Sequence, residues 1–214
     1  MSSLLTPPLG RRRFLLGSLG LAASPLLPAS ALAQARTPTP AQTAGPFYPV
    51  DFPADVDFDL VRLRGSDARA EGTVAHVAGR VLGLDGRPVP DAAVEIWQCD
   101  ARGRYLHPGD RGGPRDAAFQ GYGRVRTGAD GSYRFRTIRP VAYPGRTPHI
   151  HFAVRAPGGS SLVTQMYVAG EPNARDGLYR SLSEAGRRAV TVPLSPANGI
   201  ESGALAGTFD IVLG

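Results

Sequence analysis

The chain has 214 residues, 42% of them hydrophobic and 20% charged, which is ordinary for a globular protein with one sizeable core and short for two. Its formal net charge of +6 comes from 24 basic residues, all of them arginine, against 18 acidic residues. The arginines are scattered rather than clustered in one stripe, so composition gives little support to nucleic-acid binding and we expect no nucleic-acid partner.

Glycine and proline are abundant, at 27 and 20 residues, which favours short strands joined by tight turns over a helical fold. Cys99 is the only cysteine, so an internal disulfide is excluded. Stability is then expected to come from the core, and from a metal ion if one is bound.

The first 33 residues predict an export signal. Arg11, Arg12 and Arg13 begin an Arg-Arg-x-Phe-Leu pattern that resembles a twin-arginine signal, and the small-x-small cleavage site Ala31-Leu32-Ala33 ends the segment. The apolar part between them is broken by glycine and proline and is too short for a stable membrane span. A generic secretory signal is the alternative and also gives export. We expect a periplasmic or secreted protein that begins near Gln34 with 21 basic and 18 acidic residues, a net charge of +3.

Residues 34–70 are rich in proline and show no strand or helix pattern, so we expect an irregular N-terminal arm there. Its segment Gly45-Pro46-Phe47-Tyr48-Pro49 carries two aromatic rings that need a partner surface, so the arm is expected to pack on the following domain. Residues 71–214 are predicted to form that single domain.

Two Asp-Gly pairs predict β-hairpins in this domain. The expected strand pairs are 77–84 with 92–100 around Asp85-Gly86, and 121–127 with 132–138 around Asp130-Gly131. Polar and apolar residues alternate strictly through 132–138, which is typical of a half-buried antiparallel strand.

Four more strands and one helix complete the prediction. The strands are expected at 149–155, 162–168, 189–192 and 208–213, and the helix within 176–188. Eight short strands separated by turn signals are typical of an all-β fold, and we predict an antiparallel β-sandwich with an irregular N-terminal arm and long active-site loops.

The segment Pro148-His149-Ile150-His151-Phe152 places two histidines two residues apart on a predicted strand. Alternate residues of a strand share a face, so we expect both imidazoles on one side and Ile150 and Phe152 on the other. Imidazole is a good ligand for iron, copper and zinc. A histidine pair without a metal, in the core or on the surface, is the plain alternative.

Other ligands could complete a metal site around this pair. His76 and His107 are the only further histidines, and the acids Glu171 and Asp176 follow the pair in a loop. A three-histidine site and a carboxylate-completed site therefore both stay open.

The oxygen donors nearest before the histidines are phenols. Tyr143 lies six residues ahead of His149, and Tyr105 follows the predicted strand that carries Trp97. A phenol has a pKa near 10 in solution, so only a strongly acidic cation such as trivalent iron displaces its proton. The sequence has seven tyrosines, and spacing alone does not select these two.

The sequence resembles the intradiol ring-cleavage dioxygenases, the family of protocatechuate and catechol dioxygenases. The resemblance runs from residue 45 to about residue 167 and covers most of the expected mature chain. Its motifs follow in order: Gly45-Pro46-Phe47-Tyr48-Pro49, Gly86-x-Pro88-x-Pro90, Val94-Glu95-Ile96-Trp97-Gln98, Gly103-x-Tyr105-x-His107, Gly121-x-Gly123-Arg124, Gly131-x-Tyr133-x-Phe135-x-Thr137-Ile138-x-Pro140, Tyr143-Pro144 and Pro148-His149-Ile150-His151-Phe152.

The resemblance implies a β-sandwich enzyme that holds Fe(III) with Tyr105, Tyr143, His149 and His151. The implied reaction is intradiol cleavage of a catechol-type ring by O2 to a muconate-type dicarboxylic acid, so the expected partners are a small catechol and O2. The family often assembles into oligomers, and a homo-oligomer is expected here as well.

The resemblance also implies roles around the metal. Arg146, three residues before His149, would stabilise charge on the activated ring, and Tyr143 would accept a substrate proton. The substrate pocket would be lined by Tyr48, Trp97 and Gln165.

The chain departs from the better-known members in one loop. Only five residues, from Pro144 to Pro148, separate Tyr143 from His149, and Gly145 stands where an aromatic residue often follows the Tyr-Pro pair. We therefore expect a more open site. No segment matches the helical N-terminal domain of the catechol-specific members, so the architecture is expected to resemble the protocatechuate branch.

Two rival functions share part of this pattern. The stretch from Gly79 to Pro90 also resembles carboxypeptidase-regulatory and transthyretin-like β-sandwich modules, which are binding or structural domains without a metal. Such a module does not account for the ordered tyrosines and histidines. A copper or zinc cupin-like enzyme would also use His-x-His, but this chain lacks the glutamate that such an enzyme has a few residues later.

Overall fold

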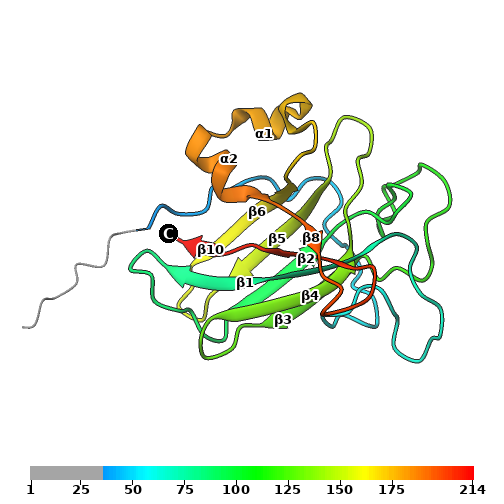
Figure 1. Cartoon of the computed structure of the whole chain (residues 1–214), viewed down its shortest axis with the longest axis horizontal. Helices are drawn as coiled ribbons and strands as arrows, with labels where there is room; N and C mark the ends of the chain where they lie inside the picture. The colour runs from blue at the N-terminus through cyan, green and yellow to red at the C-terminus, as the bar shows by residue number, and fades with distance from the viewer. Residues whose placement is uncertain (1–35) are drawn as a thin grey trace, which may run out of the picture. The chain divides into compact units, whose positions relative to one another are not determined.

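The computed structural model describes residues 36–214, so the export signal expected at 1–33 lies outside the described part of the chain. Residues 36–214 belong to one folded unit built from two β-sheets (Figure 1). From Arg36 to Thr73 the chain forms no helix or strand longer than an isolated bridge.

Each sheet has five strands. The first contains β1 (Val74–Gly83), β4 (Ser132–Ile138), β8 (Ser195–Pro196), β9 (Leu205–Thr208) and β10 (Ile211–Leu213). The second runs in the order β3 (Tyr122–Arg126), β2 (Ala93–Trp97), β5 (His149–Arg155), β6 (Ser161–Val168) and β7 (Thr191–Val192). The predicted all-β sandwich is confirmed, with the refinement that β1·β9, β1·β10 and β6·β7 are parallel pairs, so both sheets are mixed.

The main core lies between the two sheets. It takes alternate side chains from each, such as Val77 and Phe135 from the first sheet and Ile96, Ile150 and Phe152 from the second. The outer face of the second sheet is buried as well, because the N-terminal arm packs Phe47, Tyr48 and Val56 against a smaller cluster around Trp97. Side chains that point away from the main core on β2, β5 and β6 are therefore enclosed rather than exposed.

The hairpin predicted at Asp85-Gly86 is wrong. The turn forms, and the Val89 N–H donates to the Val81 carbonyl at 2.9 Å, but β1 and β2 belong to different sheets. Pro88 and Pro90 have no N–H to continue an antiparallel ladder, so the returning chain leaves β1 and crosses to the second sheet.

The hairpin predicted at Asp130-Gly131 is wrong for a related reason. The Gly131 carbonyl accepts from the Val81 N–H at 2.9 Å, which docks this turn on β1. β4 then pairs with β1 along its whole length, from Val74↔Ile138 to Arg80↔Ser132, while β3 pairs with β2. The alternation predicted for 132–138 is confirmed as far as Arg136, with Tyr133 and Phe135 buried between exposed or half-buried residues. It ends there, because Thr137 and Ile138 are both buried.

The C-terminal elements are divided more finely than predicted. The helical segment consists of a turn of 3-10 helix, η1 (Asn173–Arg175), followed by α1 (Gly177–Ser181) and α2 (Glu184–Val190). Ser183 breaks it, since its hydroxyl accepts from the Gly186 N–H at 3.0 Å and caps a new helix. The strand predicted at 189–192 begins only at Thr191, and the strand predicted at 208–213 is split into β9 and β10 at Phe209-Asp210.

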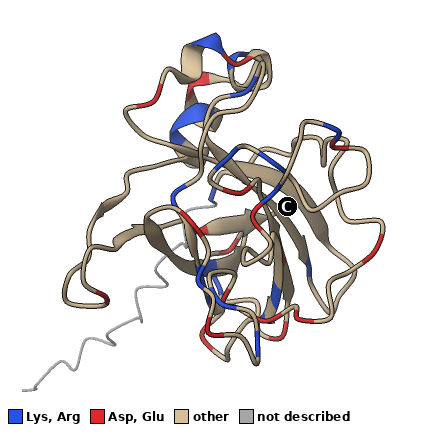
Figure 2. Cartoon of the chain, turned by 90° about the vertical axis from the view of Figure 1, so that its right-hand side faces the viewer, with Lys and Arg blue, Asp and Glu red and all other residues tan. Residues whose placement is uncertain are grey.

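Arginines and acids are interspersed over the described chain, as Figure 2 shows. Within residues 36–214, none of the helices has the length and apolar character needed to cross a bilayer.

Candidate active site

The two histidines of β5 lie on the outer face of the second sheet. Ile150 and Phe152 point into the main core, so the alternation predicted for this strand is confirmed. The register places His151 directly between Trp97 on β2 and Gln165 on β6, in one cross-strand row. The next row pairs His149 with Tyr167.

The histidine side chains converge on each other. Their Nε2 atoms are 3.2 Å apart. The Nδ1 of His149 is 2.6 Å from the Thr147 carbonyl and donates to it, which leaves its Nε2 as a lone-pair donor. The His151 ring stacks on Trp97 at 4.8 Å and 7°. Both rings are therefore held with nitrogen atoms aimed at a common point.

Burial keeps both imidazoles neutral. It lowers the pKa of His149 to about 4, helped by the nearby charge of Arg146. Burial also lowers the pKa of His151 well below its usual value, with His149 and Arg146 as further causes. Neutral imidazole is the form that ligates metals.

Two loops bring the tyrosines to the same place. The Tyr105 loop follows β2, and the Tyr105 N–H donates to the Asp110 carboxylate at 2.8 Å. The Tyr143 loop follows β4, and the Tyr143 hydroxyl accepts from Arg146 Nη1 at 3.4 Å. Together the four rings form a closed circuit with centroid separations of 5.5, 5.5, 4.8 and 6.1 Å, in the order Tyr105, Tyr143, His149, His151 and back to Tyr105.

The Tyr105 hydroxyl is buried and has no hydrogen-bond partner among residues 36–214. Leaving a buried hydroxyl unpaired costs about 1–3 kcal/mol. Burial, followed by the proximity of Tyr143, raises the pKa of Tyr105 well above its usual value. A buried phenol oxygen beside two facing imidazole nitrogens is a set of donors able to bind a cation that displaces the phenol proton.

Arg146 is fixed beside Tyr143 by two partners. Its Nε donates to Asp176 Oδ2 at 2.8 Å, and its Nη2 donates to Gln165 Oε1. Asp176 is buried and also accepts from the N–H groups of Thr147, Leu178 and Tyr179, which caps α1. Burial opposes its ionisation, but Arg146 and these N–H groups outweigh burial and hold the pKa of Asp176 below its usual value.

The three residues predicted to line the substrate pocket have different surroundings. Trp97 lies behind His151 and is fully buried. Tyr48 packs edge-on against Trp97 at 4.9 Å and donates its hydroxyl to Glu95 Oε2 at 2.7 Å. Gln165 is fully buried, contacts Arg146, and donates its amide to the Thr43 carbonyl at 3.0 Å. Trp97 thus contacts a histidine of the site and Gln165 contacts Arg146, whereas Tyr48 contacts Trp97 and Glu95.

The other ligand sets are not assembled. Among residues 36–214 there is no group of three or more His, Cys, Asp and Glu side chains able to hold a metal. His76 bonds to Glu201 at 3.0 Å on the first sheet, and Glu171 pairs with Arg139. His107 packs on Phe47 at 5.7 Å and accepts from the Gly109 N–H. The gathered donors are two phenols and two imidazoles, a set that fits a hard trivalent cation.

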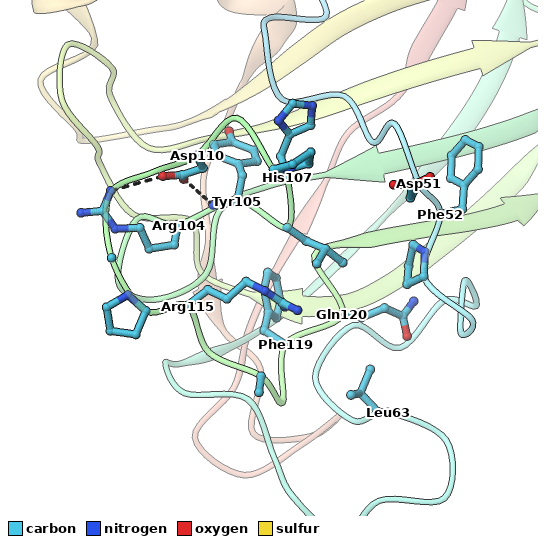
Figure 3. A pocket seen from close by; sticks show the side chains of 16 residues that line it. Asp51, Phe52, Leu63, Arg104, Tyr105, His107, Asp110, Arg115, Phe119 and Gln120 are labelled. Atoms are coloured by element: carbon cyan, nitrogen blue, oxygen red, sulfur yellow. Dashed lines mark hydrogen bonds and ion pairs between the residues drawn. The ribbon is translucent and has the colours of Figure 1, made fainter.

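Two cavities adjoin the tyrosines of the site. A cavity of about 230 Å³, here called the Tyr143 cavity, is lined by Ala142, Tyr143, Gly145, Arg146, Thr147, Pro172, Arg175 and Asp176. A larger one of about 690 Å³ lies beside Tyr105, and among its lining residues are Arg104, His107, Asp110, Arg115, Phe119 and Gln120 (Figure 3). Of these two cavities, only the Tyr143 cavity is lined both by a candidate metal ligand, Tyr143, and by the arginine that contacts it, Arg146. We therefore assign substrate binding to this smaller cavity.

Three residues that support the site were not predicted from the sequence. Phe47 stacks on Tyr105 at 4.7 Å and packs edge-on against Tyr143 at 6.4 Å. Thr147 orients His149, and Asp176 holds Arg146. Phe47 could have been found, since its motif carried aromatic rings in need of a partner surface. The contact between Arg146 and Asp176 joins residues 30 positions apart, and no local pattern signals it.

The amino-acid sequence is similar to those of known dioxygenases. A family model described as Dioxygenase matches residues 43–214. The protocatechuate 3,4-dioxygenase beta chain of Burkholderia cepacia is 40% identical over 178 residues, which cover 78% of this chain and 76% of that protein. Hydroxyquinol 1,2-dioxygenase of Corynebacterium glutamicum is 35% identical over 158 residues, 65% of this chain and 49% of that protein, so the chain spans about half the length of this relative.

The fold is shared as well. The dioxygenase domain of a dioxygenase–carbohydrate-binding fusion from Streptomyces sp. SirexAA-E superposes with a TM-score of 0.65 at 35% identity. The match covers 83% of this chain and 98% of that domain.

Proposed function

The chain belongs to the intradiol ring-cleavage dioxygenase family, and from this premise we propose that it is a non-haem Fe(III) enzyme that opens catechol-type rings with O2 to muconate-type dicarboxylic acids. One observation carries the proposal most directly. The buried, unpartnered hydroxyl of Tyr105 belongs to the same closed circuit of rings as Tyr143, His149 and His151.

These four side chains would hold the iron. Two phenolates would balance two of its three positive charges, and the neutral imidazoles would complete the set without adding charge. The chemistry that Fe(III) supplies in such a site is binding of the catechol as a dianion and exchange of electrons between the ring and O2.

The chain's own residues prepare the substrate. Tyr143 is half-buried and borders the Tyr143 cavity, so its oxygen is placed to accept a proton from an incoming hydroxyl. Arg146 keeps a positive charge beside that oxygen and is held rigid by Asp176 and Gln165. Preorganised donors of this kind typically contribute about 3 kcal/mol to stabilising charge that develops during a reaction.

The proposal is tested by oxygen uptake of the iron-loaded protein against catechol, protocatechuate and hydroxyquinol, with identification of the product. We expect one O2 consumed per ring and a product with two new carboxyl groups. If protein with a full complement of iron consumes no oxygen with any of the three substrates, the proposal is overturned. The non-enzymatic module is the less favoured function, because its resemblance ends at Pro90 and leaves the four rings unexplained.

We also propose that the protein is exported through the twin-arginine pathway, cleaved after Ala33, and assembled as a homo-oligomer. The arginine triplet and the cleavage site in the first 33 residues support export and cleavage. The frequent assembly of family members into oligomers supports the homo-oligomer. N-terminal sequencing of the exported protein and its mass in solution test these points. A mature N-terminus other than Gln34, or a monomer, would contradict them.

A further inference from the structure

The Tyr143 cavity has the size of a single substituted ring. A cavity of about 150 Å³ suffices for benzene, and this one measures about 230 Å³. Tyr143 and Arg146 line one part of it, and the segment from Pro172 to Asp176 lines another. A catechol with its hydroxyls toward Tyr143 would therefore direct its remaining ring positions toward that segment.

The cavity carries one uncompensated positive charge. The positive charge of Arg146 is balanced by the carboxylate of Asp176, with which it forms an ion pair at 2.8 Å. Arg175 is exposed and has neither an ion pair nor a side-chain hydrogen bond among residues 36–214. The other acid of its segment, Glu171, is already paired with Arg139. The guanidinium of Arg175 is thus free to bind an anion at the cavity.

The lining of the cavity leaves room for a ring substituent at Gly145. Gly145 has φ +81°, and a Cβ built on it would meet no atom within 4 Å. The cavity is therefore not closed over at this position, and a ring larger than catechol itself can be admitted.

We infer that this enzyme prefers catechols that carry a carboxylate, and that Arg175 is the specificity-determining residue that binds the carboxylate while the two hydroxyls face Tyr143. The inference rests on the proposed function. A guanidinium presents paired N–H donors that match a carboxylate in a bidentate arrangement. An unsubstituted catechol has no carboxylate for Arg175 to bind. Arg175 therefore raises kcat/KM for a carboxylated catechol relative to kcat/KM for catechol itself.

The test compares kcat/KM for 3,4-dihydroxybenzoate and for catechol in the iron-loaded full chain. We expect Arg175→Gln to lower the ratio of the two values about tenfold, the effect of losing one charge-assisted pair at a partly exposed rim. Arg175→Lys should retain part of the ratio, since it keeps the charge and loses the fork. Arg180→Gln, which removes an exposed arginine from α1 in the same region, is the matched control and should leave the ratio unchanged.

A binding measurement gives a readout that does not require turnover. 4-Hydroxybenzoate has the carboxylate but lacks the second hydroxyl, and phenol lacks both. Calorimetric titration should show that wild-type protein prefers 4-hydroxybenzoate over phenol and that Arg175→Gln loses most of this preference. Raised salt should weaken the preference in the wild type, because the pair lies near solvent.

The outcomes separate the two proposals. An unchanged ratio in Arg175→Gln, or an equal fall in kcat/KM for both substrates, overturns the role of Arg175 while the enzyme remains a catechol dioxygenase. If iron-loaded wild-type protein consumes no O2 with 3,4-dihydroxybenzoate, catechol or hydroxyquinol, the proposed function is overturned and the substrate preference with it. Activity on hydroxyquinol alone overturns only the preference.

Discussion

The Nε2 atoms of His149 and His151 face each other across 3.2 Å on the outer face of β5. Each ring is fixed from behind, His149 by the Thr147 carbonyl and His151 by the Trp97 ring. Two buried, neutral imidazoles in this arrangement direct their nitrogens to one point, and the orphaned Tyr105 hydroxyl lies in the same circuit. The fold itself therefore brings these donors together, through contacts of the protein chain.

Replacing either histidine of the pair should abolish tight iron binding. We expect His149→Ala and His151→Ala to weaken iron affinity by more than about 100-fold, since loss of even an outer partner of a metal ligand commonly costs about 10–100-fold. Iron per protein after dialysis measures the effect. His76→Ala is the control, because His76 bonds to Glu201 on the other sheet, and it should keep its iron. Equal iron in all three variants would contradict the assigned ligands.

Asp176 should act as a positioning residue for Arg146. We expect Asp176→Asn to lower kcat by about tenfold or more, the range for loss of a preorganised charge, while iron content stays full. The variant keeps an oxygen for the α1 cap but loses the charge that pairs with Arg146. Glu171→Gln, in the same segment and paired with Arg139, is the matched control. An unchanged kcat in Asp176→Asn would show that Arg146 needs no such partner.

Iron uptake should release protons from the tyrosines. Burial raises the pKa of both Tyr105 and Tyr143, so the free phenols are protonated at neutral pH and must become phenolates on binding. Affinity should therefore rise with pH by about tenfold per unit for each proton released. His149, with its pKa lowered to about 4, releases none near neutrality. A pH indicator in weakly buffered solution counts the protons, and Tyr105→Phe should release one fewer than wild type.

A second ion cluster, on the first sheet, should give the fold its acid sensitivity. Arg136 pairs with Asp59 at 2.9 Å and with Glu201 at 2.7 Å, and hydrogen bonding to Arg136 lowers the pKa of Glu201 from 4.5 to about 2. A carboxylate whose pKa is depressed in the folded state stabilises above its unfolded pKa and loses that contribution as pH falls.

We therefore expect the melting temperature of the wild type to fall between pH 4.5 and pH 2 more steeply than that of Glu201→Gln. The two curves should converge only below pH 2, where Glu201 is protonated in the folded protein as well. Glu184→Gln removes an exposed acid and should follow the wild-type curve. Parallel curves for Glu201→Gln and wild type would refute the assignment.

The local parts of the fold were predictable from sequence and the long-range parts were not. The alternation around His149 and His151 fixed which side chains share a face, because the period of a strand is a local property. The Asp-Gly turns were also correct as turns. Which strand each turn leads to depends on the pairing of the sheets. Prolines direct the segment after Asp85-Gly86 to the second sheet, and the docking of Gly131 on β1 directs the segment after Asp130-Gly131 to the first.

The candidate site divides in the same way. Spacing indicated the histidine pair, and a family resemblance was needed to choose Tyr105 and Tyr143 among seven tyrosines. The support of Arg146 by Asp176, and the exposure of Arg175 at the Tyr143 cavity, arise because η1 and α1 pack beside the loop before β5. Contacts between segments 30 residues apart leave no periodic signal in the sequence.

The visible absorption spectrum of the iron-loaded protein tests the central claim most directly. Phenolate bound to Fe(III) gives a charge-transfer band, so protein with one iron per chain should be red to burgundy, and Tyr105→Phe or Tyr143→Phe should shift and weaken the band. A colourless protein with a full complement of Fe(III) would contradict ligation by tyrosine.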